Sequence, residues 1–246
     1  MKKLFIFLAI SLMVSGMDTT VYPSEKEAAT GYPQPDKLCA LTFDDGPSAD
    51  PELTSLVLDK LESYGVVATF FLVGKNINDS TRAVINRMVA DGNEVGNHSW
   101  SYDDMANMSE DQVRKSVEDT TRAIREYAGV SPVFFRPPNL STGSIMFSTI
   151  DMPFVSGVVG GDWPGGGGDT TAHIMEKLMP DVKDGVIILL HDVQPKPHPT
   201  PKALDTLIPE LKKEGYEFVT LSELFKKKEV VPETKTGIMY VYVGQD

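Results

Sequence analysis

Cysteine is almost absent from this chain, with Cys39 as the single one among 246 residues. One cysteine cannot form an intramolecular disulfide, so the fold has to be stabilised by burial of a core rather than by cross-links. Cys39 lies inside an apolar stretch, which favours a buried small side chain over a catalytic thiol.

Basic residues are also few in relation to acidic ones. The chain has 23 Lys and Arg against 35 Asp and Glu, which gives a formal net charge of -12 at pH 7. Such a balance argues against nucleic acid or an anionic membrane surface as a partner. It is compatible with neutral or cationic polymers.

The apolar run at residues 4–14 is too short to favour a transmembrane helix. Lys2 and Lys3 precede it, and the small residues Ser15 and Gly16 follow, which is typical of a secretory signal peptide over residues 1–16. An uncleaved anchor is the alternative. We expect a secreted or cell-envelope protein without stable membrane insertion after signal cleavage.

Composition divides the rest of the chain into three parts. Residues 17–36 are polar and rich in proline and glycine, and we predict an extended linker there. A single domain over residues 37–228 follows, long enough to bury a sizeable core. Residues 229–246 form a C-terminal tail, in which the apolar residues 238–243 predict a terminal strand with no identifiable partner.

Apolar runs in the domain alternate with longer amphipathic stretches, which predicts about seven strands with helices between most of them. The predicted strands are 38–43, 66–73, one beginning at 94–95, 133–135, 153–159, 186–190 and 217–220. The predicted helices are 51–64, 80–91, 109–127, 169–179, 202–214 and 222–228, with Ser109 and Asp169 as N-caps and Gly129 as a stop. This alternation predicts a single-domain α/β fold, a distorted (β/α) barrel with parallel strands.

Two adjacent carboxylates, Asp44 and Asp45, come at the end of the first predicted strand, and the turn signal Gly46-Pro47 follows. Neighbouring side chains on a strand point to opposite faces, so both can serve one site only where the strand ends and turns. The carboxyl ends of strands form the mouth at which barrel enzymes carry out chemistry. A metal ligand beside a general base is one interpretation, and an Asx-turn at a strand end is the other.

His98 follows the short strand at 94–95, and imidazole is a favoured ligand of zinc and similar metals. A lone histidine is more often structural, but His98 is expected at the same mouth as Asp44 and Asp45. Together with Asp45 it supplies two ligands, whereas a catalytic site usually has three from the protein.

Other strand ends carry further chemistry. Arg136 precedes two prolines that fix the backbone, and it can pair with a carboxylate and orient it. His191 ends the strand at 186–190, and Asp162 can hydrogen-bond to it and raise its pKa. Trp163 is either a wall for a sugar ring or part of the core.

Taken in order, these motifs resemble those of the polysaccharide deacetylases, carbohydrate esterase family 4, over residues of about 37–224. Each motif alone is weak, but five in family order, each at a predicted strand end, strongly favour this fold. The motifs are Thr42-Phe43-Asp44-Asp45-Gly46, His98-Ser99-Trp100-Ser101, Arg136-Pro137-Pro138, Asp162-Trp163 and Leu189-Leu190-His191-Asp192.

The resemblance implies that Asp44 is the general base and that Arg136 orients it. It also implies that Asp45 and His98 are ligands of a divalent metal ion. Zinc is the expected ion, with cobalt and nickel as alternatives.

The resemblance further implies that His191 is the general acid and that Asp162 tunes it. Leu189 and Trp163 would form opposite walls of the pocket for the acetyl methyl group. The backbone N–H of Asn139 would help to hold the oxyanion.

One departure from the family pattern concerns the metal. The second histidine of the family's Asp-His-His triad is replaced by Tyr102, and a neutral phenol, with an ordinary pKa of about 10, is a poor ligand. Tyr102 is nevertheless the predicted third ligand, with Asp103, Asp104 or water as substitutes. Lesser departures are Asn139, where tyrosine is usual, and Val159, where aspartate is frequent.

The leading hypothesis is metal-dependent removal of acetyl groups from a carbohydrate polymer. Glycans that contain N-acetylglucosamine, such as peptidoglycan or chitin-like chains, are the first expected substrates, and O-acetylated xylan is the alternative. A carbohydrate-binding protein that has lost its metal is the rival from another class, favoured by Tyr102. A glycosidase with two carboxylates fits less well, because it leaves His98 and His191 without roles.

Overall fold

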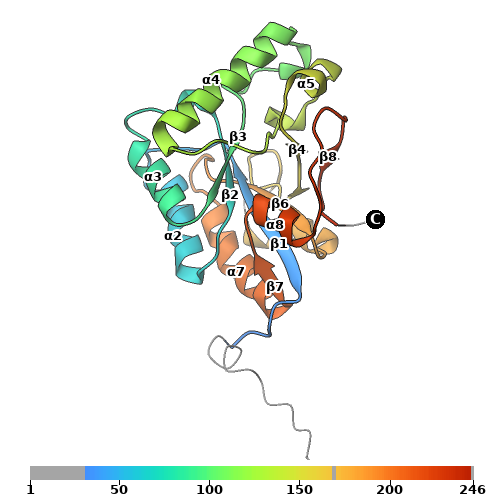
Figure 1. Ribbon diagram of the computed structural model, residues 1–246. Coiled ribbons are helices and arrows are strands. Elements are labelled where there is room, and N and C mark those ends of the chain that lie inside the picture. Colours follow the sequence, from blue (N-terminus) through green and yellow to red (C-terminus); the bar gives the residue numbers. More distant parts are fainter. Residues whose placement is uncertain (1–30, 168–169, 245–246) are drawn as a thin grey trace, which may run out of the picture.

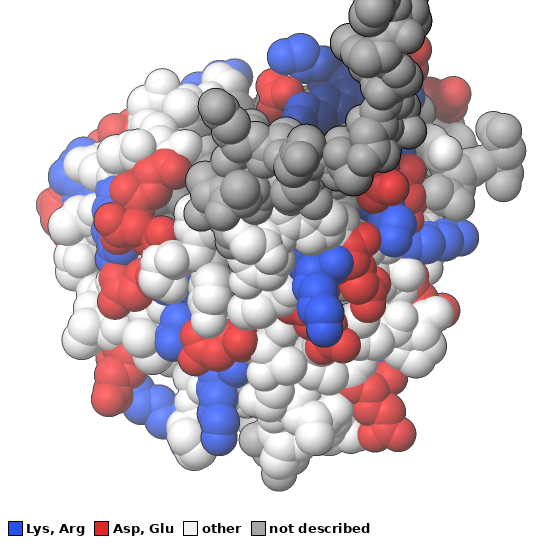
Figure 2. All heavy atoms as spheres, turned by 90° about the horizontal axis from the view of Figure 1, so that it is seen from below, with Lys and Arg blue, Asp and Glu red and all other residues white. Residues whose placement is uncertain are grey.

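The computed structural model describes residues 31–167 and 170–244. The predicted signal peptide and most of the predicted linker lie outside these residues and stay predictions. Within the described part of the chain, no helix is long and apolar enough to cross a membrane. On the face shown in Figure 2, acidic and basic side chains are interleaved.

The main sheet is parallel and centred on β1, with the order β3-β2-β1-β6-β5 and with β7 paired to β1 beside this path. The strands are β1 (Lys37–Asp44), β2 (Thr69–Leu72), β3 (Glu94–Asn97), β4 (Phe154–Val155), β5 (Val158–Val159), β6 (Val186–His191), β7 (Tyr216–Phe218) and β8 (Met239–Tyr240). β1 and β6 are continuous apolar runs because both faces of a parallel sheet are covered. The register pairs Asp44 with His191, so two of the predicted catalytic residues end neighbouring strands.

The C-terminal tail completes the strand arrangement. β8 pairs with β4 in a second, two-stranded sheet, and single bridges join Phe135 to Asn97 and to Phe154. Another bridge joins Tyr242 to Val186 of β6. A path therefore runs from β6 through β1, β2, β3, β4 and β8 back to β6, a distorted ring in which the tail lies beside β4 (Figure 1).

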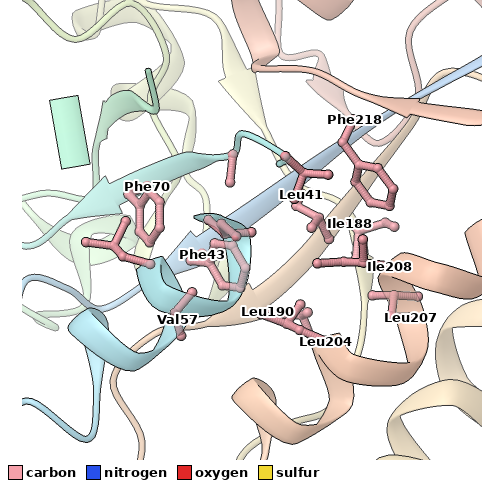
Figure 3. Close-up of a cluster of buried hydrophobic side chains, with 14 of the residues drawn as sticks. Leu41, Phe43, Val57, Phe70, Ile188, Leu190, Leu204, Leu207, Ile208 and Phe218 are labelled. Carbon is pink, nitrogen blue, oxygen red and sulfur yellow. The ribbon is translucent and has the colours of Figure 1, made fainter. Parts of the chain in front are cut away.

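Helices cover the outside of this ring (Figure 1). They are α2 (Thr54–Tyr64), α3 (Arg82–Ala90), α4 (Glu110–Ala128), α5 (Ser144–Thr149), α6 (Thr171–Leu178), α7 (Thr200–Lys213) and α8 (Leu221–Lys227), and single 3-10 turns are η1 (Gly74–Asn76), η2 (Met105–Asn107), η3 (Pro138–Leu140) and η4 (Met179–Asp181). Apolar side chains of β1 and β6 pack against α2 and α7, as Figure 3 shows for Leu41, Phe43, Val57, Ile188, Leu190, Leu204, Leu207 and Ile208. Burial of this core, with Cys39 inside it, stabilises the strand ends that carry the site.

Local signals predicted some element ends well. Ser109 caps α4 in a capping box with Gln112, and Gly129 ends the same helix with a left-handed φ of 70°, as expected. The N-cap of α6 is Thr170, whose hydroxyl accepts from the backbone N–H of His173; the predicted cap, Asp169, lies outside the described residues.

Other predicted elements were wrong in extent. The predicted strand at 133–135 is reduced to a bridge at Phe135, because the flanking prolines donate no backbone N–H to a ladder. The predicted strand at 153–159 is divided into β4 and β5. The short helix α5 was not predicted, and α2 begins at Thr54 rather than at residue 51.

Candidate active site

The end of β1 places two carboxylates at the rim of the ring. Asp44 is the last residue of β1 and is buried, and Asp45 turns the chain with a φ of 82°. This positive φ is uncommon for a residue with a side chain, and it lets consecutive carboxylates share one site. The Nε2 atom of His98 lies 3.7 Å from a carboxylate oxygen of each aspartate.

A single hydrogen bond fixes the ring of His98, which follows β3. Its Nδ1 lies 2.8 Å from the carbonyl oxygen of Arg136, and because a carbonyl can only accept, Nδ1 carries the proton. Nε2 therefore points toward the two aspartates. Imidazoles that bind metals adopt this tautomer, with the other nitrogen donating to a carbonyl or carboxylate.

Arg136 lies behind Asp44 and is completely buried. Its Nη1 donates to Asp44 Oδ1 at 2.7 Å, and its Nη2 donates to the carbonyl oxygen of Ser156 at 2.5 Å. Burial alone would raise the pKa of Asp44, but the Arg136 guanidinium and two nearby imidazoles outweigh it and lower that pKa. Asp44 is therefore an oriented carboxylate that can accept a proton.

His191 forms the opposite side of the site together with Asp162. The Nδ1 atom of His191 lies 2.8 Å from Asp162 Oδ1, while Asp162 Oδ2 accepts from the His191 backbone N–H at 2.8 Å and from the Thr200 hydroxyl. Burial alone would lower the pKa of His191. Asp162 and the carboxylates at the end of β1 outweigh this effect and raise the pKa to about 9. The imidazole is therefore protonated at neutral pH.

A cavity of about 510 Å³ connects the two sides, lined by both aspartates at the end of β1, by His98 after β3 and by His191 at the end of β6. Tyr102, Asn139, Trp163 and Leu189 are also in its lining. The Trp163 ring lies edge-on to the ring of His191, with 5.5 Å between the ring centroids. Trp163 is thus a wall of the cavity rather than a core residue.

A second cavity, of about 330 Å³, adjoins the first and shares with it Trp163, Pro164, Gln194 and Pro195. The space beside the predicted acid therefore continues past Trp163. A ligand longer than one sugar residue can extend in this direction.

Asp45 and His98 fit a divalent cation. Burial raises the pKa of Asp45 even though two imidazoles oppose it, and within the described chain its ion pairs include no Lys or Arg. A cation beside this carboxylate would compensate the charge that burial leaves unpaired. The described residues contain no group of three His, Cys, Asp or Glu side chains arranged around one point, so a complete site needs a ligand of another kind.

Tyr102, the predicted third ligand, is in the lining of the same cavity. Its hydroxyl donates to the carbonyl oxygen of Asp45 at 3.4 Å, and the Lys75 ammonium lies 4.7 Å from the centroid of its ring. Burial and the charge of Asp45 raise the pKa of the phenol well above its ordinary value. The phenol is neutral without a bound ion, which makes it a weak ligand.

The acidic residues that follow Tyr102 bond elsewhere. Asp103 accepts from the hydroxyl of Ser101, and Asp104 accepts from the side-chain amide of Asn107 at 2.6 Å. Neither is in the lining of the cavity. Water is therefore the better substitute for the missing imidazole.

Sequence reasoning assigned no role to several residues that support the site. Asp192 is completely buried, and burial raises its pKa to about 7. Its place beside His191 in the motif was the signal that could have identified it. Three further side chains donate hydrogen bonds within the site: Thr54 to Asp192, Asn76 to the Asp45 carbonyl oxygen and Thr200 to Asp162. No pattern in the sequence indicates these roles.

Comparison with known proteins identifies the family. The family model described as polysaccharide deacetylase matches residues 31–149. A peptidoglycan-N-acetylglucosamine deacetylase of Bacillus cereus is 33% identical over 210 residues, which cover 81% of this chain and 95% of that protein. The chain belongs to the polysaccharide deacetylase family. The resemblance inferred from the five motifs is thereby confirmed.

Other relatives of this family member are described as xylan enzymes. A bifunctional xylanase/deacetylase of Pseudobutyrivibrio xylanivorans is 44% identical over 83% of this chain and 33% of its own length. This chain thus spans about a third of that relative, and about two fifths of a Listeria monocytogenes peptidoglycan deacetylase.

Solved structures confirm the α/β fold. A family 4 acetyl xylan esterase from Clostridium thermocellum, in complex with a cobalt ion, is 55% identical with a TM-score of 0.81, covering 85% of this chain and all of that one. The CE4 domain of a multidomain xylanase from a Trinervitermes trinervoides hindgut metagenome is 43% identical with a TM-score of 0.79. The match covers 85% of this chain and 99% of that one.

Proposed function

We propose that this protein hydrolyses acetyl groups on a carbohydrate polymer, with a divalent ion held by Asp45 and His98. One observation carries the proposal: an ionised carboxylate, Asp44, and a protonated imidazole, His191, line one cavity from neighbouring strand ends. Tyr102 faces the third ligand position. The cobalt ion in the related esterase supports a divalent ion, and zinc is our first expectation.

Asp45 and His98 would hold the divalent ion, which would supply a Lewis acid for the acetyl carbonyl and for the attacking water. Asp44 accepts the proton of the attacking water, and Arg136 keeps Asp44 ionised and correctly oriented. His191 donates a proton to the departing oxygen or nitrogen, since alkoxides and amines are poor leaving groups. Each such proton transfer typically contributes about 100- to 10,000-fold to the rate.

The remaining predicted residues shape the site around the acetyl group. Asn139 lies in η3 with a φ of 54° on the rim of the cavity, and we assign its backbone N–H to the developing oxyanion. Leu189 and Trp163 are the proposed walls for the methyl group. The adjoining cavity beyond Trp163 supports a polymeric substrate over a single sugar.

We infer that O-acetylated xylan is the preferred polymer, the alternative to the N-acetylglucosamine glycans expected first. Three relatives above 40% identity over more than four fifths of this chain are described as acetyl xylan esterase or as parts of xylanases. The peptidoglycan deacetylases compared are 31% to 36% identical. A predicted signal peptide agrees with an extracellular polymer of either kind.

Acetate release by the purified chain with cobalt or zinc tests the proposal, with acetylated xylan and N-acetylated chitin oligomers compared at equal acetyl concentration. We expect faster release from xylan. Faster release from the chitin oligomers would overturn the polymer assignment alone. No release from any acetylated glycan at saturating ion would overturn the activity.

Tyr102 supports one rival, a carbohydrate-binding protein without catalysis. Catalysis can be lost in this family, since one neighbour is described as a mutant of a CE4 pseudoenzyme with restored activity, at 28% identity and a TM-score of 0.67. Binding of acetylated xylan without any acetate release at saturating cobalt would establish the rival.

A further inference from the structure

Asp192 is a fully buried carboxylate that takes no part in the proposed proton transfers. Its Oδ1 accepts from the backbone N–H of Gly46 at 3.0 Å, and its Oδ2 accepts from the Thr54 hydroxyl at 2.5 Å. Its own backbone N–H donates to the carbonyl oxygen of Asp44 at 3.2 Å. Asp192 therefore bonds to the backbone on both sides of Asp45.

The backbone of Asp45 needs such support. Its φ of 82° is costly for a residue with a side chain, and such conformations persist only where the surroundings fix them. The Asn76 side-chain amide donates to the Asp45 carbonyl at 2.9 Å, and the Val73 N–H donates to the Gly46 carbonyl at 2.8 Å. Asp192 is the carboxylate among these partners.

The contact between Asp192 and the turn is close. A Cβ atom added to Gly46 would overlap both carboxylate oxygens of Asp192, so any other residue here would displace this carboxylate. The Thr54 hydroxyl, which donates to Asp192, also accepts from the Ser48 backbone N–H at 2.9 Å. The carboxylate thus connects the turn to the first residue of α2.

We propose that Asp192 is a positioning residue that fixes Asp45 for ion binding and couples the ends of β1 and β6. This inference rests on the proposed ion site at Asp45 and His98. Asp192 directly follows His191, so the same residue ties the acid's strand to the turn that carries the ion ligand. Groups that support a metal ligand typically change ion affinity about 10- to 100-fold when removed.

Asp184 offers a matched control at the other end of the same strands. Its Oδ1 accepts from the backbone N–H of Leu38, the second residue of β1, at 2.8 Å, and its other oxygen pairs with Lys228. Asp184 lies just before β6, and Asp192 lies just after the same strand. If the loss of either aspartate only weakened β1, cobalt affinity would fall in both Asp184→Ala and Asp192→Ala. If Asp192 positions the ion ligand, cobalt affinity falls in Asp192→Ala alone.

The experiment measures cobalt affinity of the ion-free full chain through the visible absorption of the bound ion, with thermal unfolding of the same ion-free samples. We expect Asp192→Ala to weaken cobalt binding about 10- to 100-fold. Asp192→Asn keeps an acceptor for the Gly46 N–H and should restore most of the affinity. Asp184→Ala should bind cobalt as the wild type does, even where it lowers the unfolding temperature.

Equal cobalt affinity in the Asp192→Ala variant and the wild type would overturn the inference. If Asp192→Ala does not fold, Thr54→Val decides, because it keeps the shape of the side chain but removes the hydroxyl that donates to Asp192 and accepts from the Ser48 N–H. We expect cobalt binding about 2- to 10-fold weaker, and unchanged affinity overturns the inference. A wild type that binds cobalt but releases no acetate overturns the proposed function alone. A wild type that binds no cobalt overturns both.

Discussion

The two sides of the active cavity differ in how completely they are built. On the acid side, Asp162 accepts two hydrogen bonds from His191 and one from Thr200, and the pKa of the imidazole is raised to about 9. On the ion side, Asp45 and His98 lie 3.7 Å apart, and the residue that we propose as the third ligand, Tyr102, has a phenol whose pKa is raised above its ordinary value. Buried hydrogen bonds thus fix His191 and Asp162 in place. The departure from the family's motif, at Tyr102, falls on the ion side and is expected to affect ion affinity.

The largest expected effect comes from the base. Asp44→Asn keeps the shape of the side chain but removes the proton acceptor, and we expect acetate release to fall about 100- to 10,000-fold. The ion site is left intact, so cobalt affinity measured on the same sample serves as the control. Unchanged turnover would remove Asp44 from its assigned role.

Substitutions of Tyr102 test how much the third ligand position limits ion affinity. Tyr102→His supplies the imidazole of the family triad, and we expect zinc to bind about 10- to 100-fold more tightly, measured by competition with a chelator. Tyr102→Phe removes only the hydroxyl, and its effect should stay below about 10-fold because the neutral phenol is a weak ligand. A larger loss in Tyr102→Phe would show that the phenol itself binds the ion.

The acid side is weakened by Asp162→Asn. The pKa of His191, about 9 in the native protein, should return to its ordinary value of about 6.5 or lower. An NMR titration of the imidazole in ion-free protein measures this, and acetate release at pH 8 should fall about 30-fold with the protonated fraction. A pKa that stays near 9 would contradict the assignment to Asp162.

The same raised pKa sets a pH dependence of stability. A histidine whose pKa is higher in the folded state contributes its full stabilisation below about pH 6.5. That contribution is lost as the pH rises through about 9. The stability difference between wild type and Asp162→Asn should therefore shrink over this interval.

The smallest expected effect lies outside the site, in the tail that closes the ring. Val243 is buried while Val231 is 84% exposed, so the two valines are a matched pair. Val243→Ala should lower the free energy of unfolding by about 1–2 kcal/mol in chemical denaturation, and Val231→Ala should leave it nearly unchanged. Acetate release per folded molecule should be the same in both; a loss confined to Val243→Ala would show that the tail also shapes the site.

The strand-end motifs were predictable because each follows an apolar run and precedes a turn signal, as Asp44 and His191 do. Helix α4 was predictable from its local caps. The bond from Thr54 to Asp192 joins residues 138 positions apart. The partner of β8, Phe154–Val155, is also distant in the chain, so no local pattern predicts either contact. The positive φ of Asp45 was likewise a product of tertiary contacts that the sequence does not display.

Anomalous diffraction from a crystal of the protein soaked in cobalt locates the ion itself. We expect one strong peak within bonding distance of His98 Nε2 and a carboxylate oxygen of Asp45, on the wall of the cavity that faces His191. No peak at that position in saturating cobalt, or a peak bound by other residues, would contradict this expectation.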